Sequence, residues 1–150
     1  MSLKTSQVET LITPVGIPVA SPGGVYKYIH PMTRLATDLS TQAIDLLTNF
    51  TPGHAFKLLS LAFVTTVAGT GTSASQVFNL EIGTTNVTGG VLTLTLASQS
   101  AIGVVTNATA ITALNEGSAT DTISLEMAAS GTVFTAGAGY FVISIQNLAG

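Results

Sequence analysis

The sequence predicts an all-β protein: an antiparallel, jelly-roll-like β-sandwich with an extended N-terminal arm. Apolar and polar residues alternate in several short runs, a pattern typical of strands that bury one face. Glycine-rich turn sequences separate these runs, and no long amphipathic helix is visible. The length of 150 residues suits a single folded domain. We therefore expect an arm over residues 1–36 and a sandwich over residues 37–150.

The predicted arm, residues 1–36, holds four of the five prolines. Proline fixes φ and favours extended conformations in its neighbourhood. One short strand is expected at Val25–His30, after a Pro22-Gly23-Gly24 turn. The arm is also rich in apolar residues, which favours an arm that orders on a neighbouring subunit over a flexible leader. The candidate contact residues are Val8, Leu11, Ile12 and Tyr26.

Two segments follow the arm. Residues 40–50 are interpreted as a strand, because apolar and polar residues alternate there and a turn, Thr51-Pro-Gly-His54, follows at once. A helix is the alternative, since Ser40 is a plausible N-cap. Residues 58–67 form a longer strand that is apolar on both faces at its start. This strand is expected either at the centre of a sheet or in a subunit interface.

Four further strands show clear period-two patterns, at residues 76–82, 91–96, 122–128 and 140–146. Residues 83–90 lack the lysine of a phosphate-binding loop and are interpreted as a hairpin. Residues 108–114 form either a strand or one helical turn. The residues expected to share one apolar face of each strand are Phe78, Leu80 and Ile82; Leu92, Leu94 and Leu96; Ile123, Leu125 and Met127; and Phe141, Ile143 and Ile145.

The chain carries very little charge. Only 7% of its residues are Asp, Glu, Lys or Arg, whereas an average soluble domain is about a quarter charged. Such a surface gives little repulsion between copies, so the sequence predicts a component of an assembly. The net charge of −3 and four scattered basic residues make a nucleic-acid partner unexpected. No apolar run approaches the roughly 20 residues of a membrane-spanning helix, so no membrane partner is expected.

No set of residues forms a recognisable catalytic, metal or cofactor site, so we expect no enzyme activity and no cofactor. His30 and His54 lie in neither a hydrolase motif nor a metal-binding spacing. The chain has no cysteine, which excludes disulfides and thiolate ligands. Glu81 and Glu126 are most simply solvated, although they could be neighbours across strands, as a glycosidase pair would require. Asp121 is expected to make a turn hydrogen bond to the nearby backbone.

Four segments resemble small jelly-roll proteins of tailed bacteriophage virions, and together they span residues 42–148. They are AIDLLTNFTPGHAFKLLSLAFVTTV, VFNLEIGTTNVTGGVLTL, GSATDTISLEM and FTAGAGYFVISIQNL. The resemblance implies a capsid decoration (cement) protein or head-fibre base on the outer surface of the virion head. It also implies a homotrimer and the major capsid protein as partner, with the arm clamping that protein or a neighbouring protomer.

The alternative is a tail-fibre or receptor-binding module that binds glycans. A stalk-like repeat before the β domain would favour this alternative, and the sequence shows none. The chain has no tryptophan and only three tyrosines, Tyr26, Tyr28 and Tyr140, from which to build a sugar-binding platform. A major shell or pilus-like subunit is a further alternative, but the short chain with no long helix is unlike a tailed-phage shell protein. The sequence therefore favours a decoration protein.

Overall fold

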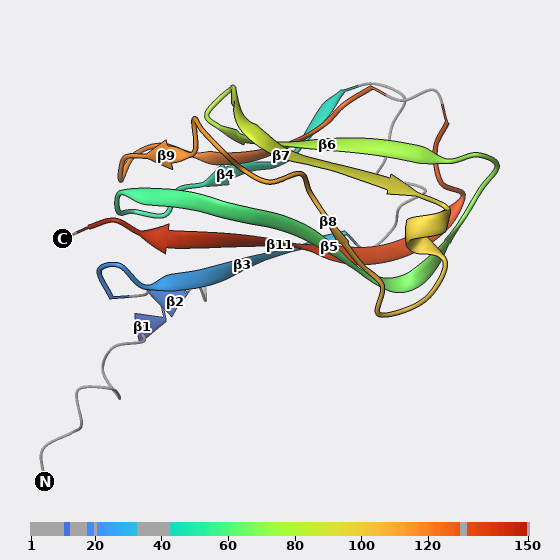
Figure 1. The fold of residues 1–150 in the computed structure, drawn as a ribbon, viewed down its shortest axis with the longest axis horizontal. Helices are drawn as coiled ribbons and strands as arrows, with labels where there is room; N and C mark the ends of the chain where they lie inside the picture. Colours follow the sequence, from blue (N-terminus) through green and yellow to red (C-terminus); the bar gives the residue numbers. More distant parts are fainter. Residues whose placement is uncertain (1–10, 13–17, 20, 33–42, 130–131, 150) are drawn as a thin grey trace, which may run out of the picture.

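The structure, a computed structural model, describes residues 11–12, 18–19, 21–32, 43–129 and 132–149. It confirms the predicted class: the chain is all-β, and two antiparallel sheets pack face to face as a sandwich (Figure 1). The strands are β1 Leu11–Ile12, β2 Pro18–Val19, β3 Val25–Met32, β4 Ile44–Phe50, β5 Phe56–Thr70, β6 Ser75–Ile82, β7 Thr85–Thr95, β8 Val105–Asn107, β9 Glu116–Gly117, β10 Ile123–Met127 and β11 Ala136–Asn147. One 3₁₀ turn, η2, spans Ala97–Gln99.

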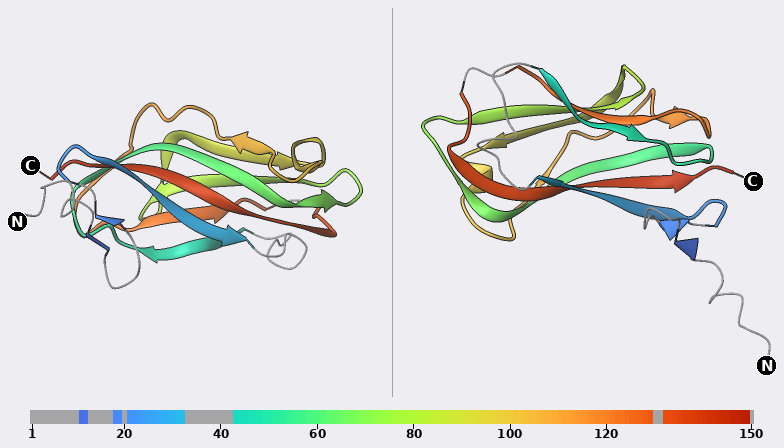
Figure 2. Two further views of the ribbon diagram at one scale, coloured as in Figure 1. Left: turned by 90° about the horizontal axis from the view of Figure 1, so that it is seen from below. Right: turned by 180° about the vertical axis from the view of Figure 1, so that it is seen from behind.

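The two layers have different strand orders (Figure 2). One is a four-stranded sheet in the order β4-β10-β6-β7. The other is a five-stranded sheet in the order β3-β11-β5-β8, with β9 also paired to β5. Strands β1 and β2 pair only with each other among the described strands. We refer to these layers as the four-stranded sheet and the five-stranded sheet.

Strand pairing in the sandwich is nested along the chain. The outermost pair is β3 with β11, the next is β4 with β10, then β5 with β8, and the innermost is β6 with β7. Every pair is antiparallel. The chain therefore crosses between the sheets at most connections, and it stays in one sheet at the β6–β7 hairpin. This hairpin confirms the interpretation of residues 83–90.

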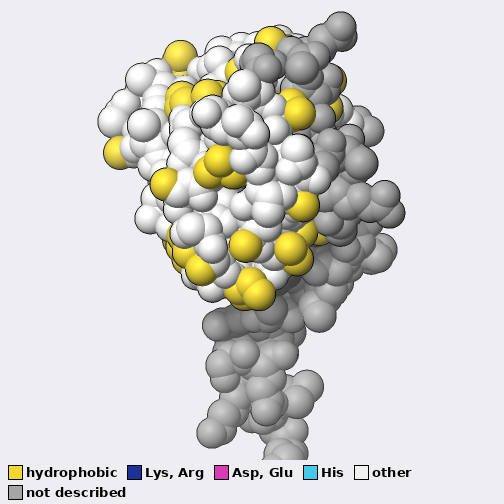
Figure 3. All heavy atoms as spheres, turned by 90° about the vertical axis from the view of Figure 1, so that its right-hand side faces the viewer, with side chains coloured by type: hydrophobic (Ala, Val, Ile, Leu, Met, Phe, Trp, Pro, Cys, Tyr) yellow, Lys and Arg dark blue, Asp and Glu magenta, His cyan; other side chains and the backbone are white. Residues whose placement is uncertain are grey.

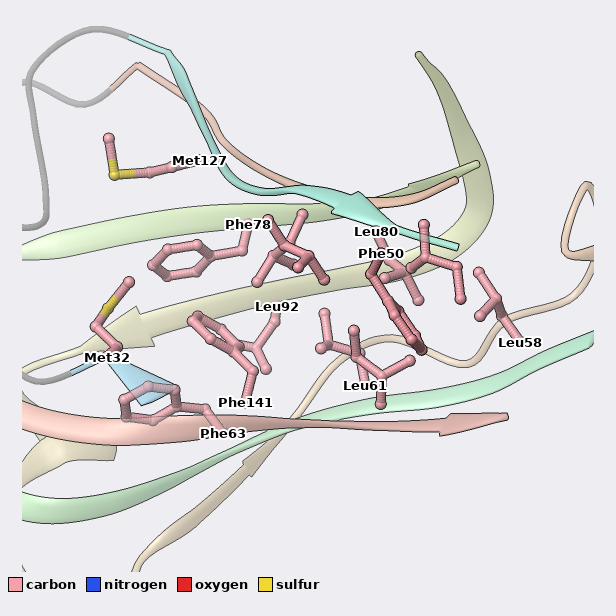
Figure 4. Close-up of a cluster of buried hydrophobic side chains, with 14 of the residues drawn as sticks. Met32, Phe50, Leu58, Leu61, Phe63, Phe78, Leu80, Leu92, Met127 and Phe141 are labelled. Atoms are coloured by element: carbon pink, nitrogen blue, oxygen red, sulfur yellow. The ribbon is translucent and has the colours of Figure 1, made fainter. Parts of the chain in front are cut away.

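The core fills the space between the sheets with side chains from both layers (Figure 4). The predicted apolar faces of β10 and β11 are fully buried, as are Phe78 and Leu80 of β6 and Leu92 and Leu94 of β7. Ile82 and Leu96 are only partly buried and pack at the margin of the core. The Phe141 ring lies edge-on to the rings of Phe63 and Phe78, with both centroid distances 4.9 Å. Aromatic packing thus joins the two sheets at the centre.

The two segments that follow the predicted arm are both strands. Residues 44–50 form β4, but register shifts against β10 interrupt the simple alternation, so Leu47 and Phe50 are buried while Ile44 is exposed. Residues 56–70 form β5, which lies between β11 and β8 and is therefore a central strand. A bulge between Leu58 and Ser60 leaves Leu59 on the surface. This bulge explains why the start of the strand looks apolar on both faces.

Segment 108–114 is neither a regular strand nor a helix. It runs beside β7 and is held there by backbone bonds, including Gly90 N to Thr109 O at 3.0 Å and Thr88 N to Ala113 O at 2.9 Å. This close approach requires glycine at position 89. Gly89 has a φ of +84°, and a β-carbon there would overlap the Ala110 carbonyl. The Gly89-Gly90 pair therefore serves the packing of a surface segment.

The strand expected at Val25–His30 is present as β3, and it extends to Met32. It does not belong to an arm, however. β3 pairs with β11 from Val25 to Met32 and forms an edge of the five-stranded sheet. The preceding turn is tied to the same strand, since Gly23 N donates to Asn147 O at 2.7 Å. Residues 21–32 are thus part of the sandwich, and the predicted boundary at residue 36 lies too late in the chain.

Candidate interaction surfaces

Three of the four predicted contact residues lie at the start of the chain. Val8 lies outside the described residues. Leu11 and Ile12 form β1 and pair with Val19 and Pro18 of β2. Their predicted contact with a neighbouring protein stays a prediction.

Tyr26, the fourth predicted contact residue, is buried within its own chain and is only 7% exposed. Its hydroxyl lies 3.0 Å from Nε2 of His54, in the turn between β4 and β5. His54 Nδ1 lies 3.0 Å from the Ala55 carbonyl, which accepts its proton, so Nε2 accepts from the tyrosine. Burial raises the pKa of Tyr26 to about 12, so it remains a donor. Tyr26 therefore joins β3 to the sandwich and is not available to a partner, because alternation along β3 points it inward.

The outer surface of the five-stranded sheet carries a continuous apolar area. Cross-strand pairing aligns Pro31, Tyr140, Val64 and Val105 in one row across β3, β11, β5 and β8. The adjacent row contains Ile29, Val142 and Ala62 and ends at Asn107. Ile29 is 49% exposed and Val105 53% exposed, at opposite margins of the sheet. We call these seven apolar residues the apolar face: Ile29, Pro31, Ala62, Val64, Val105, Tyr140 and Val142.

Charge is sparse around the apolar face. Lys27 is next to it on β3 and pairs in register with Ser144. Lys57, farther along β5, forms an ion pair with Glu116 of β9 at 2.7 Å. Lys57 thus pairs with neither Glu81 nor Glu126. Among the described residues, the charges that border the apolar face are therefore Lys27 and the Lys57–Glu116 ion pair.

The outer surface of the four-stranded sheet has the opposite character, because it carries three carboxylates. Glu126 of β10 pairs in register with Asp45 of β4, and Ser124 pairs with Glu81 of β6. Glu81 is only 7% exposed, so the expectation that it is solvated is incorrect. Its burial, together with Glu126 and Asp45, raises the pKa of its carboxyl. We call Asp45, Glu81 and Glu126 the acidic face.

Glu81 and Glu126 do lie on neighbouring strands, as the sequence allowed, but they are not directly opposite each other, because across β6 and β10 Glu81 pairs with Ser124 and Glu126 with Asn79. Among the described residues, no group of three or more His, Cys, Asp or Glu is arranged to hold a metal ion. His30 is half-buried on the inner side of β3, and this burial lowers its pKa. These polar groups form sheet contacts, and they do not converge on one site.

One end of the sandwich shows no charged side chain among its described residues (Figure 3). The segments between β5 and β6, between β7 and β8, and before β11 meet at this end, and their described residues carry no charge. Hydroxyl, glycine and aliphatic residues predominate, and Gln99 and Phe134 are buried. Ile102, in the segment after η2, is 75% exposed. Hydrogen bonds join Gln99 of η2 to Thr65 of β5 and Thr106 of β8. In the buried bond between Thr65 and Gln99, Thr65 Oγ1 donates to Gln99 Oε1 at 2.8 Å.

Comparison with protein-family models, with curated proteins and with solved structures finds no match to this chain. In the described part of the chain, no helix is long and apolar enough to span a membrane. The candidate functional features of the described residues are the apolar face and the acidic face. Sequence reasoning missed the apolar face, although Val142 lies between the predicted inward residues Phe141 and Ile143 and is itself apolar. Ile29 and Pro31 are also apolar, but no face was predicted for their segment. Their alignment into rows depends on strand pairing, which the sequence does not display.

Proposed function

We propose that this chain is a structural protein of a tailed-bacteriophage virion, a capsid decoration protein on the outer surface of the head. It acts there as a homotrimer that binds the major capsid protein and stabilises the shell. The observation that carries the proposal is the apolar face, which spans four strands. Contact with a partner would remove its apolar side chains from water. The resemblance of residues 42–148 to small virion proteins supplies the kind of partner.

We further infer that the sandwich is a jelly roll. A jelly roll contains eight strands in two sheets with Greek-key connections. The nested pairs β3·β11, β4·β10, β5·β8 and β6·β7 support this assignment, because they fold one long antiparallel ribbon across two layers. The additional strand β9 extends the pairing of β5 without altering this order.

The mechanism we propose depends on area and repetition, with no chemical step. A single apolar face gives a modest contact, but many copies on one shell add through multivalency. Asp45 is exposed and Glu126 is partly exposed on the acidic face, and both carboxylates would be costly to bury without cations, so this is the surface that we expect to remain in water. The protein would then attach through its N-terminal arm and the apolar face, and present the acidic face to solvent.

The alternative function, a glycan-binding tail-fibre module, is less well supported. Tyr26 is buried, and the Tyr28 ring stacks on Phe50 at a centroid distance of 4.0 Å. Only Tyr140, among the described tyrosines, lies on the outer surface of a sheet, and it is half-buried there. Sugar platforms usually need broad exposed aromatic rings, and one half-buried ring offers little area.

Two measurements test the proposed function. Light scattering after size-exclusion chromatography should give a mass near three times 15.2 kDa. Antibodies against the purified chain should label the outside of phage heads in particles made by the strain that encodes it, as seen by immunogold electron microscopy. Labelling at the tail tip would support the alternative, and unlabelled particles would contradict a virion role.

A further inference from the structure

We propose that β3 is an acid-sensitive edge strand, whose contacts with the rest of the sandwich weaken when His30 and His54 gain protons. The chain contains two histidines, and both act at this strand: His30 lies on β3, and His54 is hydrogen-bonded to Tyr26 of β3. The charge of a histidine ordinarily changes between pH 5 and 8, so mild acid is the condition that affects both contacts. Residues 1–20 lead directly into this part of the chain, so opening of β3 would change how the predicted arm is held. Such regulation goes beyond the proposed virion role and does not depend on it.

β3 is an edge strand, so among the described strands its backbone pairs with one neighbour, β11 (Figure 1). Its outward residues are exposed, and its inward residues supply the other contacts with the sandwich. The inward residues are Tyr26, Tyr28, His30 and Met32. The Tyr28 ring stacks on Phe50 of β4. An edge strand with few partners opens more readily than a central strand, so these inward contacts control how often β3 opens.

The first histidine contact joins β3 to the turn between β4 and β5. The Tyr26 hydroxyl donates to Nε2 of His54 at 3.0 Å, because Nδ1 of the same ring donates to the Ala55 carbonyl. This carbonyl also accepts from Leu148 N at 2.8 Å, directly after β11. A proton on Nε2 removes the acceptor for the tyrosine. The hydroxyl proton of Tyr26, a residue that is 7% exposed, then loses its partner, and an unpaired buried donor is costly.

The second histidine contact is the partial burial of His30 on the inner side of β3. His30 pairs in register with Phe141 of β11, which is fully buried. Burial lowers the pKa of His30 from its ordinary value of 6.5, so the folded chain disfavours the charged form. The stability that neutral His30 contributes is therefore complete above pH 6.5 and is lost as the pH falls through the folded-state pKa. Protonation of His30 thus acts in the same direction as protonation of His54.

The groups around β3 do not offset the charge of a protonated histidine. The titratable neighbours on its inner side are Tyr26 and Tyr28, and burial raises the pKa of both. Lys27 and Lys57 lie on the outer side of the five-stranded sheet, and the acidic face lies on the outer side of the other sheet. The Asp121 carboxylate accepts a hydrogen bond within its own turn. Among the described residues, neither histidine forms an ion pair, so nothing there compensates for its protonation.

Hydrogen exchange of the purified full chain, read by mass spectrometry, measures how often each strand opens. The protection factor of residues 25–32 should be about fivefold or more lower at pH 5 than at pH 7.5, after correction for the intrinsic exchange rate at each pH. The protection factor of residues 75–82 should change much less, because β6 lies between β10 and β7 in the other sheet. The comparison separates opening of β3 from unfolding of the whole chain.

Two variants assign the response to the histidines. His30→Gln combined with His54→Gln removes both titrating groups, and a glutamine at position 54 keeps an oxygen that can accept a hydrogen bond. This double variant should show the same protection of β3 at both pH values. Tyr26→Phe keeps both histidines but removes the hydroxyl, so only the His30 part of the response should remain. Asp121→Asn is the matched control, because it removes a titrating group away from β3 and should leave the response unchanged.

Equal protection of β3 at pH 5 and pH 7.5 in the unchanged chain would overturn the inference, and this measurement does not require any variant to fold. An equal loss of protection in β6, or a full response in the double variant, would also overturn it. The assay contains no phage particle, so the two proposals fail separately. An acid response of β3 combined with unlabelled virions would reject the virion role alone. Labelled heads combined with a β3 that is insensitive to acid would reject the role of the histidines alone.

Discussion

At the scale of single residues, burial decides the role of the few ionisable side chains. Tyr26 is buried, and its hydroxyl pairs with His54 inside the molecule. Glu81 is also buried, but it lies near two other carboxylates, and only a hydrogen bond with Ser124 favours its charged form. Asp121 is exposed, and it accepts a hydrogen bond from the backbone of Ser118. Residues of one chemical type therefore stabilise or destabilise the fold according to their surroundings.

The raised pKa of Glu81 predicts that replacing it with glutamine, its neutral analogue, increases the stability of the fold by an amount that depends on pH. Burial, Glu126 and Asp45 raise this pKa, so the folded chain holds the proton more tightly than the unfolded chain. Stability from this group is therefore present at low pH and is lost as pH rises through the folded-state pKa. Glu81→Gln should stabilise the fold at pH 7 by roughly 0.2–1 kcal/mol, the usual range for cross-strand pairs. Urea titrations over a pH series should show the gain fading as the pH falls.

Asp121→Asn is the matched control, because its expected change in stability at pH 7 has the opposite sign. The backbone and side-chain hydrogen bonds of Ser118 lower the pKa of Asp121. The contribution of Asp121 to the stability of the fold is therefore present above its ordinary pKa and is lost as the pH falls. Asp121→Asn should therefore reduce stability at pH 7 and have no effect in acid. If Glu81→Gln also reduced stability at pH 7, the assignment of Glu81 as a destabilising carboxylate would be wrong.

At the scale of elements, β11 organises the five-stranded sheet. It pairs with β3 on one side and with β5 on the other along most of its length. Its inward residues Phe141, Ile143 and Ile145 are fully buried, while Tyr140 and Val142 contribute to the apolar face. Gly139 lets the Phe63 ring lie directly against the backbone of β11. β11 thus contributes side chains to the core and to the outer surface, and it pairs with a strand on each side.

Gly139→Ala should destabilise the sandwich through steric overlap. A β-carbon at Gly139 would overlap the Phe63 ring and the Val64 carbonyl, and the latter cannot move without disturbing the sheet. Overpacking of this kind costs about 1–3 kcal/mol. Chemical denaturation should show this loss, whereas Ala136→Ser, at an exposed position on the same strand, should have little effect. Adding Phe63→Leu should recover part of the loss, and a fully stable Gly139→Ala variant would contradict the packing argument.

At the scale of the whole molecule, the two sheets give the sandwich two unlike surfaces. The five-stranded sheet presents the apolar face, and the four-stranded sheet presents the acidic face. A third surface, at one end, shows no charge among its described residues (Figure 3). With so few charges in the chain, their placement controls which side can be buried and which must stay in water. This asymmetry underlies the proposed attachment.

Removal of residues 1–20 should separate attachment from folding. Among the described strands, β1 and β2 pair only with each other, and the turn before β3 is bonded to β11 through Gly23 N and Asn147 O. The shortened chain should therefore melt within about 2–3 °C of the full chain, a change below 1 kcal/mol. It should also lose binding to phage heads in a co-sedimentation assay. Removal of residues 1–32 is the control, because it deletes β3, exposes the edge of β11 and should impair folding. Attachment that survives the shorter deletion would refute the role of the arm.

The sequence by itself determined the all-β class, the position of most long strands and most of the core. Alternation with period two is a local property, so Phe78, Leu125 and Ile143 could be assigned to the inside without knowledge of the fold. Alternation failed where a bulge shifts the register, as in β4 and at Leu59 of β5, because a bulge depends on the partner strand. The low overall charge likewise predicted an associating surface without showing where it lies.

Only the tertiary structure decided the roles of Tyr26, Glu81 and the apolar face. Proline content suggested an arm through residue 36, yet β3 joins the sheet because β11, which is more than 100 residues later, offers an edge to pair with. The same pairing turns Tyr26 inward and sets Ile29 beside Val142. Contacts between distant strands are set by the global arrangement, and no local pattern encodes them. For this reason the sequence could predict a surface suited to association, whereas its position follows from the order in which the strands pair.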